Sequence, residues 1–173
     1  MVRAIGESDN AAADHLWAML GTPKEAAPKV QSVLAEGGDS QTTVQSEQVL
    51  PPYSAYGQTQ WSARQQARFA FALPCLGPAA ETVLEQMHNL GSGQQWGLAT
   101  FDGVAAKGGW GPEGGGGYLV RQIALVKNSS GVYVGVALAA RPTDGSFGTG
   151  VAMLNKLGNW VTSHLDQLPA GHC

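Results

Sequence analysis

The sequence predicts an α+β fold: helices first, then a small antiparallel sheet, then a closing helix. Apolar residues recur at helical spacing through the first half, β-branched and aromatic runs of strand length follow from residue 96, and helical spacing returns near residue 150. The strands follow one another without helices between them, so the order is not that of an alternating βαβ chain. With 173 residues, we expect one fold of two lobes, residues 1–95 and 96–173.

Capping signals place four helices in the first lobe. The residues from 38 to 60 are polar and carry Pro51-Pro52, so we expect a long loop there, of the kind that is usually functional or disordered. The expected helices are 11–20 with Asn10 as its cap, a second from the capping box 22–25 to Gly37 that Pro28 disturbs, a third from Ser62 that ends before Pro74, and a fourth from Pro78 to Gly91.

Four runs in the second lobe have the composition of strands, and turn-forming residues separate them. They are 96–100, 104–110, 118–127 and 132–140, with a glycine-rich hairpin tip at 111–117. A last helix, about 150–165, covers one face of the sheet. We therefore expect an exposed apolar area or an open strand edge, and hence self-association or poor solubility.

Composition excludes several classes of function. The net charge is −3 and there is no Lys/Arg cluster, so neither nucleic acid nor an anionic membrane surface is expected as a partner. No apolar run is long enough to span a membrane. The four histidines show no metal-ligand spacing, and no metal or cofactor is expected. Cys75 is expected as a buried thiol and Cys173 as an exposed, frayed one, although one bridge between them remains an alternative.

Two short motifs carry the functional argument. Ser8-Asp9-Asn10 stands just before a predicted helix, and Lys107-Gly108-Gly109 lies in a predicted strand. In order and context the pair resembles the S-D-N and K-T-G boxes of the penicillin-recognising serine hydrolases, the class A β-lactamases and serine DD-peptidases. The stretches 8–14 and 135–140 are similar to that family too. The resemblance covers nearly the whole chain and implies the C-terminal two-thirds of a β-lactamase-like fold, incomplete at its N-terminus.

The resemblance implies catalytic roles for Ser8 and Lys107. Ser8 matches the hydroxyl that relays a proton to the leaving nitrogen, and Lys107 matches the lysine that faces this hydroxyl and the substrate carboxylate. The implied substrate-binding residues are Asn10 for the acylamino carbonyl, Gly109 for close approach of the substrate backbone, Trp110 for an oxyanion-binding N–H, and Arg121 for a carboxylate.

Four of these residues also have a structural interpretation. Ser8 and Asn10 are both good N-terminal caps for the following helix. Lys107 is equally consistent with a surface lysine whose stem packs on the sheet. Arg121 is equally consistent with a salt bridge at the rim.

The sequence departs from the family in its nucleophile. No Ser or Thr has a Lys three positions later, so the Ser-x-x-Lys box that supplies the acylated serine is absent. Gly108 replaces the hydroxyl residue of the second box. Glu47 lies roughly where a deacylating glutamate is expected, but Leu50 replaces the asparagine of that Glu-x-x-Asn pair.

The resemblance therefore implies acyl transfer on D-Ala-D-Ala peptides or β-lactams for an intact relative, and a non-catalytic role for this chain. The alternative is a peptide- or protein-binding module that kept the groove and lost the nucleophile. The expected partners are a small molecule or peptidoglycan peptide, and a second copy or another segment that completes the sheet. No targeting signal is recognised in the chain, and the resemblance implies an exported or periplasmic intact parent.

Overall fold

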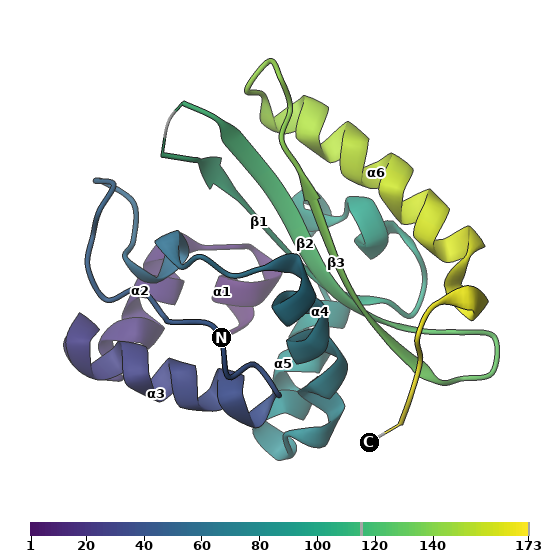
Figure 1. The fold of residues 1–173 in the computed structure, drawn as a ribbon, viewed down its shortest axis with the longest axis horizontal. Helices are drawn as coiled ribbons and strands as arrows, with labels where there is room; N and C mark the ends of the chain where they lie inside the picture. Colours follow the sequence, from purple (N-terminus) through teal and green to yellow (C-terminus); the bar gives the residue numbers. More distant parts are fainter. Residues whose placement is uncertain (115, 173) are drawn as a thin grey trace.

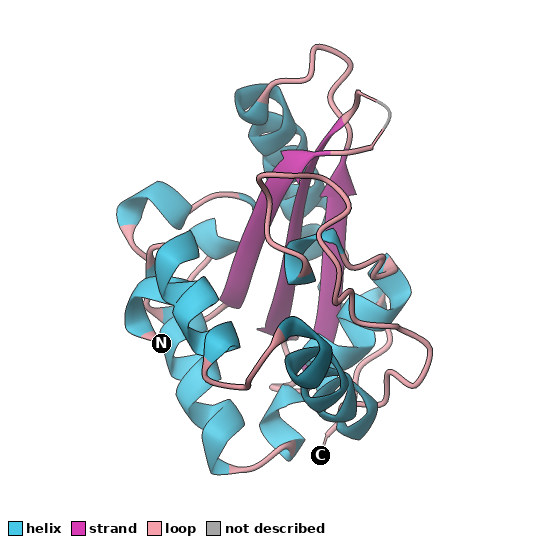
Figure 2. Ribbon diagram, turned by 90° about the vertical axis from the view of Figure 1, so that its left-hand side faces the viewer, coloured by secondary structure: helices cyan, strands magenta, loops and turns pink. Residues whose placement is uncertain are grey.

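The computed structural model describes residues 1–114 and 116–172. An antiparallel sheet in the order β1-β2-β3 lies between a group of helices on one face and a single long helix on the other (Figures 1 and 2). The strands are β1 (Ala105–Pro112), β2 (Tyr118–Lys127) and β3 (Tyr133–Ala140). The helices are α1 (Val2–Gly6), α2 (Asn10–Ala18), α3 (Pro23–Glu36), α4 (Ala63–Ala72), α5 (Pro78–His88) and α6 (Phe147–Ser163), with short 3₁₀ turns η1 (Tyr56–Gln58), η2 (Leu73–Cys75), η3 (Ser92–Gln94), η4 (Gly97–Thr100) and η5 (Leu165–Gln167).

One face of the sheet packs on the N-terminal helices, and we call it the lobe face. Ala105 of β1 and its register partner Leu125 of β2 are buried there against Ala80 and Met87 of α5. Helix α4 covers the neighbouring part of β3 so closely that a Cβ on Gly135 would lie 2.2 Å from the Ala67 carbonyl oxygen. Small residues on β3 thus allow a helix to pack directly against the strand.

The opposite face, which we call the α6 face, holds the larger core. Side chains alternate between faces along a strand, so Val120, Ala124 and Val126 of β2 point away from the lobe. They pack with Leu154 and Val161 from the inner side of α6. This face is the one that the predicted C-terminal helix was expected to cover.

The order of helices, sheet and closing helix is confirmed, with three corrections to its elements. The five-residue helix α1 was not predicted. Helix α6 begins at Phe147, where the Ser146 hydroxyl accepts a hydrogen bond from the Thr149 N–H at 3.1 Å. The N-cap of α2 is Asp9 rather than Asn10, because the Asp9 carboxylate accepts the Ala12 N–H at 2.9 Å.

The predicted strand at residues 96–100 is wrong, since that segment forms η4. Gly97 adopts a positive φ of 61°, which interrupts an extended chain. The buried amide of Gln122 then accepts the Leu98 N–H at 2.7 Å and donates to the Trp96 carbonyl at 2.7 Å. A side chain thereby satisfies the backbone groups that a neighbouring strand would otherwise pair.

In the first lobe, the expected disturbance at Pro28 is absent, whereas the expected long loop is present. Helix α3 continues through Pro28, which is exposed, so water can reach the carbonyl that the proline leaves without a donor. The long loop after α3 is held by the buried Asp39 carboxylate, which accepts hydrogen bonds from the Thr42 N–H at 3.0 Å and the Trp61 indole N–H at 2.8 Å. These bonds lower the pKa of Asp39, although burial, the largest influence, opposes them.

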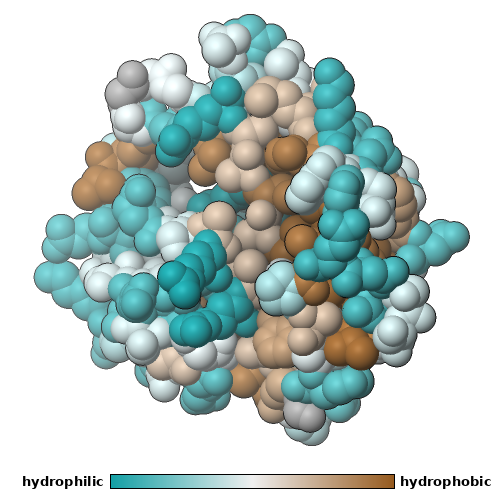
Figure 3. Space-filling model, turned by 45° about the vertical axis from the view of Figure 1, so that its right-hand side comes forward, coloured by the Kyte–Doolittle hydropathy of each residue, from teal (hydrophilic) through white to brown (hydrophobic). Residues whose placement is uncertain are grey.

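The second face of the sheet is covered, because α4 and α5 pack on it. The expectation of an open strand edge or an exposed apolar area is nevertheless met: among the described residues the outer edge of β3 pairs only at Tyr133, with Gly171, and Trp160 of α6 is 54% exposed. Figure 3, which brings the side of α6 forward, shows apolar surface bordered by hydrophilic residues. The expectation for Cys75 is wrong. Cys75 is exposed and disulfide-bonded rather than buried as a thiol, and Cys173 lies outside the described residues. Within residues 1–114 and 116–172, no helix is both long and apolar enough to cross a membrane.

Candidate functional site

Ser8 lies in the short turn between α1 and α2. Its φ is +54°, the only positive value at a described residue other than glycine, so the turn holds the chain in a conformation that L-residues disfavour. Asp9 fixes this turn from the next position: its N–H donates to the Arg3 carbonyl at 3.1 Å, and its carboxylate pairs with the Arg3 guanidinium. The Ser8 side chain is half-buried.

Lys107 reaches Ser8 from the edge strand of the sheet. Its ammonium donates a 2.8 Å hydrogen bond to the Ser8 hydroxyl, across 99 positions of sequence, and a second to the Gly108 carbonyl. The expectation that Lys107 faces the Ser8 hydroxyl is therefore confirmed. Burial lowers the pKa of Lys107 to about 8, because desolvation disfavours the charged form. Lys107 is thus still mainly protonated at neutral pH but lies close to titration.

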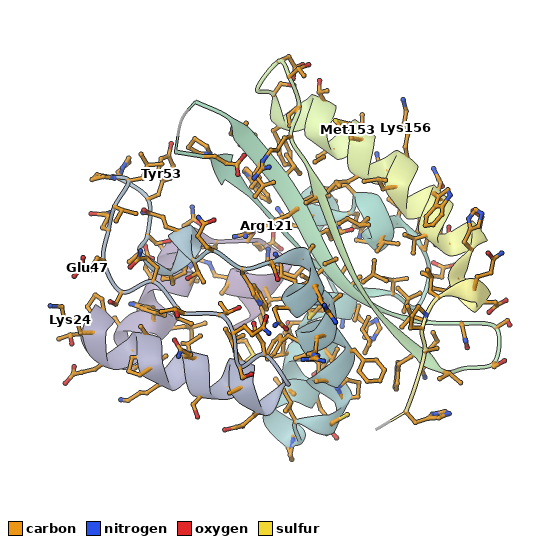
Figure 4. The ribbon with its side chains drawn as sticks, viewed as in Figure 1. Lys24, Glu47, Tyr53, Arg121, Met153 and Lys156 are labelled. Carbon is orange, nitrogen blue, oxygen red and sulfur yellow. The ribbon has the colours of Figure 1, made fainter. Side chains whose placement is uncertain are left out.

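Arg121 provides a second cation on the lobe face. It pairs in register with Gly109 of β1 on one side and Ala139 of β3 on the other. A Cβ on Gly109 would lie 3.7 Å from Arg121 Nε, so the glycine leaves room beside the guanidinium. Figure 4 shows Arg121 on the side of the sheet that faces the helical lobe.

The Arg121 guanidinium is half-buried and contributes positive charge to the site. Burial lowers its pKa, and the negative charge of Glu113 partly offsets that effect. Glu113 itself binds Arg141 through two hydrogen bonds of 2.6 and 2.8 Å. No side chain of the described residues accepts a hydrogen bond from Arg121, so its donors remain available to a ligand.

The remaining predicted residues do not join this group through their side chains. Trp110 alternates with Gly109 and therefore points to the α6 face, where its ring centroid lies 4.8 Å from that of Phe147. Its indole is 40% exposed. Asn10 is exposed at the first position of α2 and makes no side-chain hydrogen bond within the described part of the chain.

The missing hydroxyl at residue 108 has a packing cause that the sequence does not reveal. Gly108 faces the buried Trp96, and a Cβ at this position would lie 2.3 Å from the indole carbon Cζ2. Trp96 also packs edge-on against Trp110 and Phe147, with ring centroids 6.2 and 6.0 Å away. The aromatic cluster therefore leaves no room for a threonine at this position.

The loop between α3 and α4 does not bring a carboxylate to Lys107. Glu47 is exposed and lies on the outer side of this loop, away from Arg121 (Figure 4). The tip of the loop instead approaches the β1–β2 hairpin, where burial and the nearby Tyr53 raise the pKa of Tyr118. The site thus consists of two cations and one hydroxyl, with glycine and alanine beside them.

Comparison with known proteins gives matches in structure alone. No family model matches the sequence, and no curated protein matches it. Solved structures that match include the TLA-3 extended-spectrum β-lactamase at a TM-score of 0.74 and 12% identity, covering 95% of this chain and 62% of that one. A class A β-lactamase from Bacteroides cellulosilyticus matches at 0.72 and 13%, covering 96% and 62%.

A third match has somewhat higher identity. The class A β-lactamase from Mycobacterium abscessus has a TM-score of 0.71 and 20% identity, and the match covers 95% of this chain and 63% of that one. The chain therefore spans less than two-thirds of the length of these enzymes, and identities of 12–20% support a shared fold rather than a shared activity. The chain has the fold of the class A β-lactamases over that part of their length.

Proposed function

We propose that this chain binds the ligands of penicillin-recognising serine hydrolases, D-Ala-D-Ala peptides or β-lactams, without forming an acyl-enzyme. The observation that supports this most strongly is the hydrogen bond from Lys107 to Ser8 on the sheet face that also carries Arg121. Both ligand classes bear a carboxylate. An ammonium and a guanidinium on one face are suited to bind it, since charge-assisted hydrogen bonds are the stronger ones.

Each side chain has a defined part in this proposal. Arg121 offers a planar fork of donors for bidentate contact with the carboxylate, and Lys107 offers a point charge beside it. Ser8 holds the Lys107 ammonium and can turn its own hydroxyl toward the ligand. Gly109 leaves the edge of β1 accessible to the ligand main chain, because no side chain covers it.

The absence of an acyl-enzyme follows from the sequence of this chain. Acylation needs a serine with a base one helical turn away, and no Ser-x-x-Lys box is present. Ser8 donates no proton to a base in this arrangement, because the protonated Lys107 is itself the donor of their hydrogen bond. Ligand binding without turnover is therefore the activity that the side chains support.

Equilibrium titration tests the proposal. An N-acylated peptide ending in D-Ala-D-Ala is titrated by calorimetry beside the same peptide with an amidated C-terminus. We expect binding only with the free carboxylate. Arg121→Gln is expected to weaken it at least about tenfold, since a hydrogen bond to a charged group contributes roughly 1.5–3 kcal/mol. Lys156→Met, on the exposed side of α6, is the matched control and should leave affinity unchanged.

Two further measurements separate this function from the alternatives. Affinity for the carboxylate should fall as pH rises through about 8, because Lys107 loses its charge there. A peptide ending in L-Ala-L-Ala should bind more weakly; equal affinity would indicate a general peptide-binding module. An affinity that changes neither when the peptide carboxylate is amidated nor in Arg121→Gln would disprove the proposed function.

A further inference from the structure

Glu113 brings a carboxylate of this chain to the face that carries the two cations of the site. It follows the last residue of β1, and its N–H still donates to the Gly117 carbonyl at 2.9 Å, so the strand pairing continues to this position. Side chains alternate along a strand, so Glu113 lies on the same face as Lys107 and Gly109. The proposed carboxylate site therefore has an anion of its own beside it.

Arg141 holds this anion from the other end of the sheet. Its Nε and Nη2 donate hydrogen bonds of 2.6 and 2.8 Å to the two Glu113 oxygens. It follows β3 directly and lies two positions after Ala139, the register partner of Arg121, so alternation places Arg141 on the lobe face too. The two hydrogen bonds lower the pKa of Glu113, which is therefore charged at neutral pH.

Arg121 lies on the strand between Glu113 and Arg141. Its guanidinium has no hydrogen-bond acceptor among residues 1–114 and 116–172. The negative charge of Glu113 nevertheless acts on it, and the positive charge of Arg121 in turn helps to lower the pKa of Glu113. Two guanidinium groups thus attract one carboxylate, and only Arg141 is bound to it.

We propose that Glu113 competes with the ligand carboxylate for Arg121, and that Arg141 sets the affinity of the site by holding Glu113 away. This inference rests on the proposed function, because it concerns the regulation of that same site. Glu113 and the ligand offer Arg121 the same group, a carboxylate suited to bidentate binding. Neither Glu113 nor Arg141 needs to touch the ligand, so both are positioning residues.

The exposure of the pair makes such competition feasible. The Arg141 side chain is 74% exposed and that of Glu113 is 25% exposed. Ion pairs in contact with water are weak, so the attachment of Glu113 to Arg141 is readily exchanged for another cation. Arg121 is half-buried, and a charge interaction there is screened less by solvent. Without Arg141, Glu113 therefore turns to Arg121 and blocks it.

Calorimetric titration of four proteins with the peptide ending in D-Ala-D-Ala tests the competition. Arg141→Met should lower the affinity about two- to fivefold and Glu113→Gln should raise it by a similar factor, the range expected for partly exposed charge pairs. The double variant should bind as tightly as Glu113→Gln, because no competitor is left for Arg141 to restrain. Glu81→Gln, which removes an exposed charge from α5, is the matched control and should leave the affinity unchanged.

A general effect of charge predicts a different result. In that case Arg141→Met lowers the affinity equally whether residue 113 is glutamate or glutamine, and the inference is overturned while the proposed function stands. An ion pair that only closes the hairpin predicts unchanged affinity in all three variants, which overturns the inference as well.

A second measurement needs no ligand. Carbon-13 NMR follows the titration of the Glu113 carboxyl group. In Arg141→Met its pKa should stay below the ordinary value, because Arg121 replaces Arg141 as its partner, and adding Arg121→Gln should return it to that value. A return in Arg141→Met alone overturns the inference, as does a pKa that stays low when both arginines are replaced. If the peptide does not bind the wild-type chain, the proposed function fails, and this titration still decides whether Glu113 turns to Arg121.

Discussion

The Lys107 ammonium and the Ser8 hydroxyl form a 2.8 Å hydrogen bond that joins the helical lobe to the edge strand of the sheet. The bond satisfies a charge that β1 would otherwise leave half-buried, and it brings two motifs together that are remote in sequence. It is therefore both a structural tie and the centre of the proposed carboxylate site.

A double-mutant cycle measures the coupling free energy between Ser8 and Lys107. Ser8→Ala, Lys107→Met and the double variant are unfolded in urea, and we expect a coupling free energy of about 1–3 kcal/mol because one partner is charged. The same cycle with Ser8→Ala and Lys156→Met should give a value near zero, since Lys156 is exposed on α6. Equal coupling in the two cycles would mean that the Ser8–Lys107 bond contributes nothing specific.

The backbone at Ser8 gives a second prediction. Ser8→Gly and Ser8→Ala remove the same hydroxyl, but glycine accepts the φ of +54° without steric cost. Ser8→Gly should therefore be more stable than Ser8→Ala, by up to about 1 kcal/mol. The urea concentrations at which the two variants are half unfolded check this, provided that their unfolding free energies depend equally steeply on urea. A less stable glycine variant would show that the turn is not strained.

Trp96 makes Gly108 sensitive to any side chain. Gly108→Thr should cost at least about 1–3 kcal/mol of unfolding free energy, because the added atoms overlap a buried indole held by other rings. Gly111→Ala is the control on the same strand, since no atom lies within 4 Å of its Cβ position. Thermal unfolding of both variants tests this, and equal melting temperatures would contradict it.

The sequence predicts the parts of the site that depend on local order. The S-D-N string before a helix and the lysine within a strand are recognised locally, whereas the meeting of Ser8 and Lys107 across 99 positions is expected only from the family resemblance. The helices follow from capping and apolar spacing. Such features depend on residues close to one another in the chain, and these are what sequence patterns record.

The parts that the sequence does not predict depend on contacts between distant residues. η4 forms because Gln122 of β2 satisfies its backbone, and nothing near Trp96 indicates this. From the sequence, Gly108 is only a position where the family's hydroxyl is missing. The structure supplies the cause, because Trp96 occupies the space that a side chain would need. Helix α1 has only five residues, too few for a periodic pattern, and α4 covers a sheet face that the sequence leaves open.

The lowered pKa of Lys107 predicts how stability depends on pH. Its ordinary value is 10.5 and its value in the folded chain is about 8, so the unfolded chain binds more protons between these pH values. Stability relative to Lys107→Met should therefore rise with pH from about 8 to 10.5, by up to roughly 3 kcal/mol. Urea unfolding at several pH values measures this, and curves that stay parallel for the two proteins would refute the shift.

Covalent labelling gives the last prediction. A fluorescent penicillin should leave no label on the chain after denaturing electrophoresis, because no serine here has a lysine one helical turn away to accept its proton. Loss of a nucleophile lowers the rate of a serine hydrolase by about a millionfold, so reversible binding beside Lys107 leaves no covalent trace. Reversible binding by calorimetry under the same conditions distinguishes a ligand that does not react from one that does not bind. A labelled band that disappears in Ser8→Ala would show instead that Ser8 is acylated, with Lys107 as the group that takes its proton.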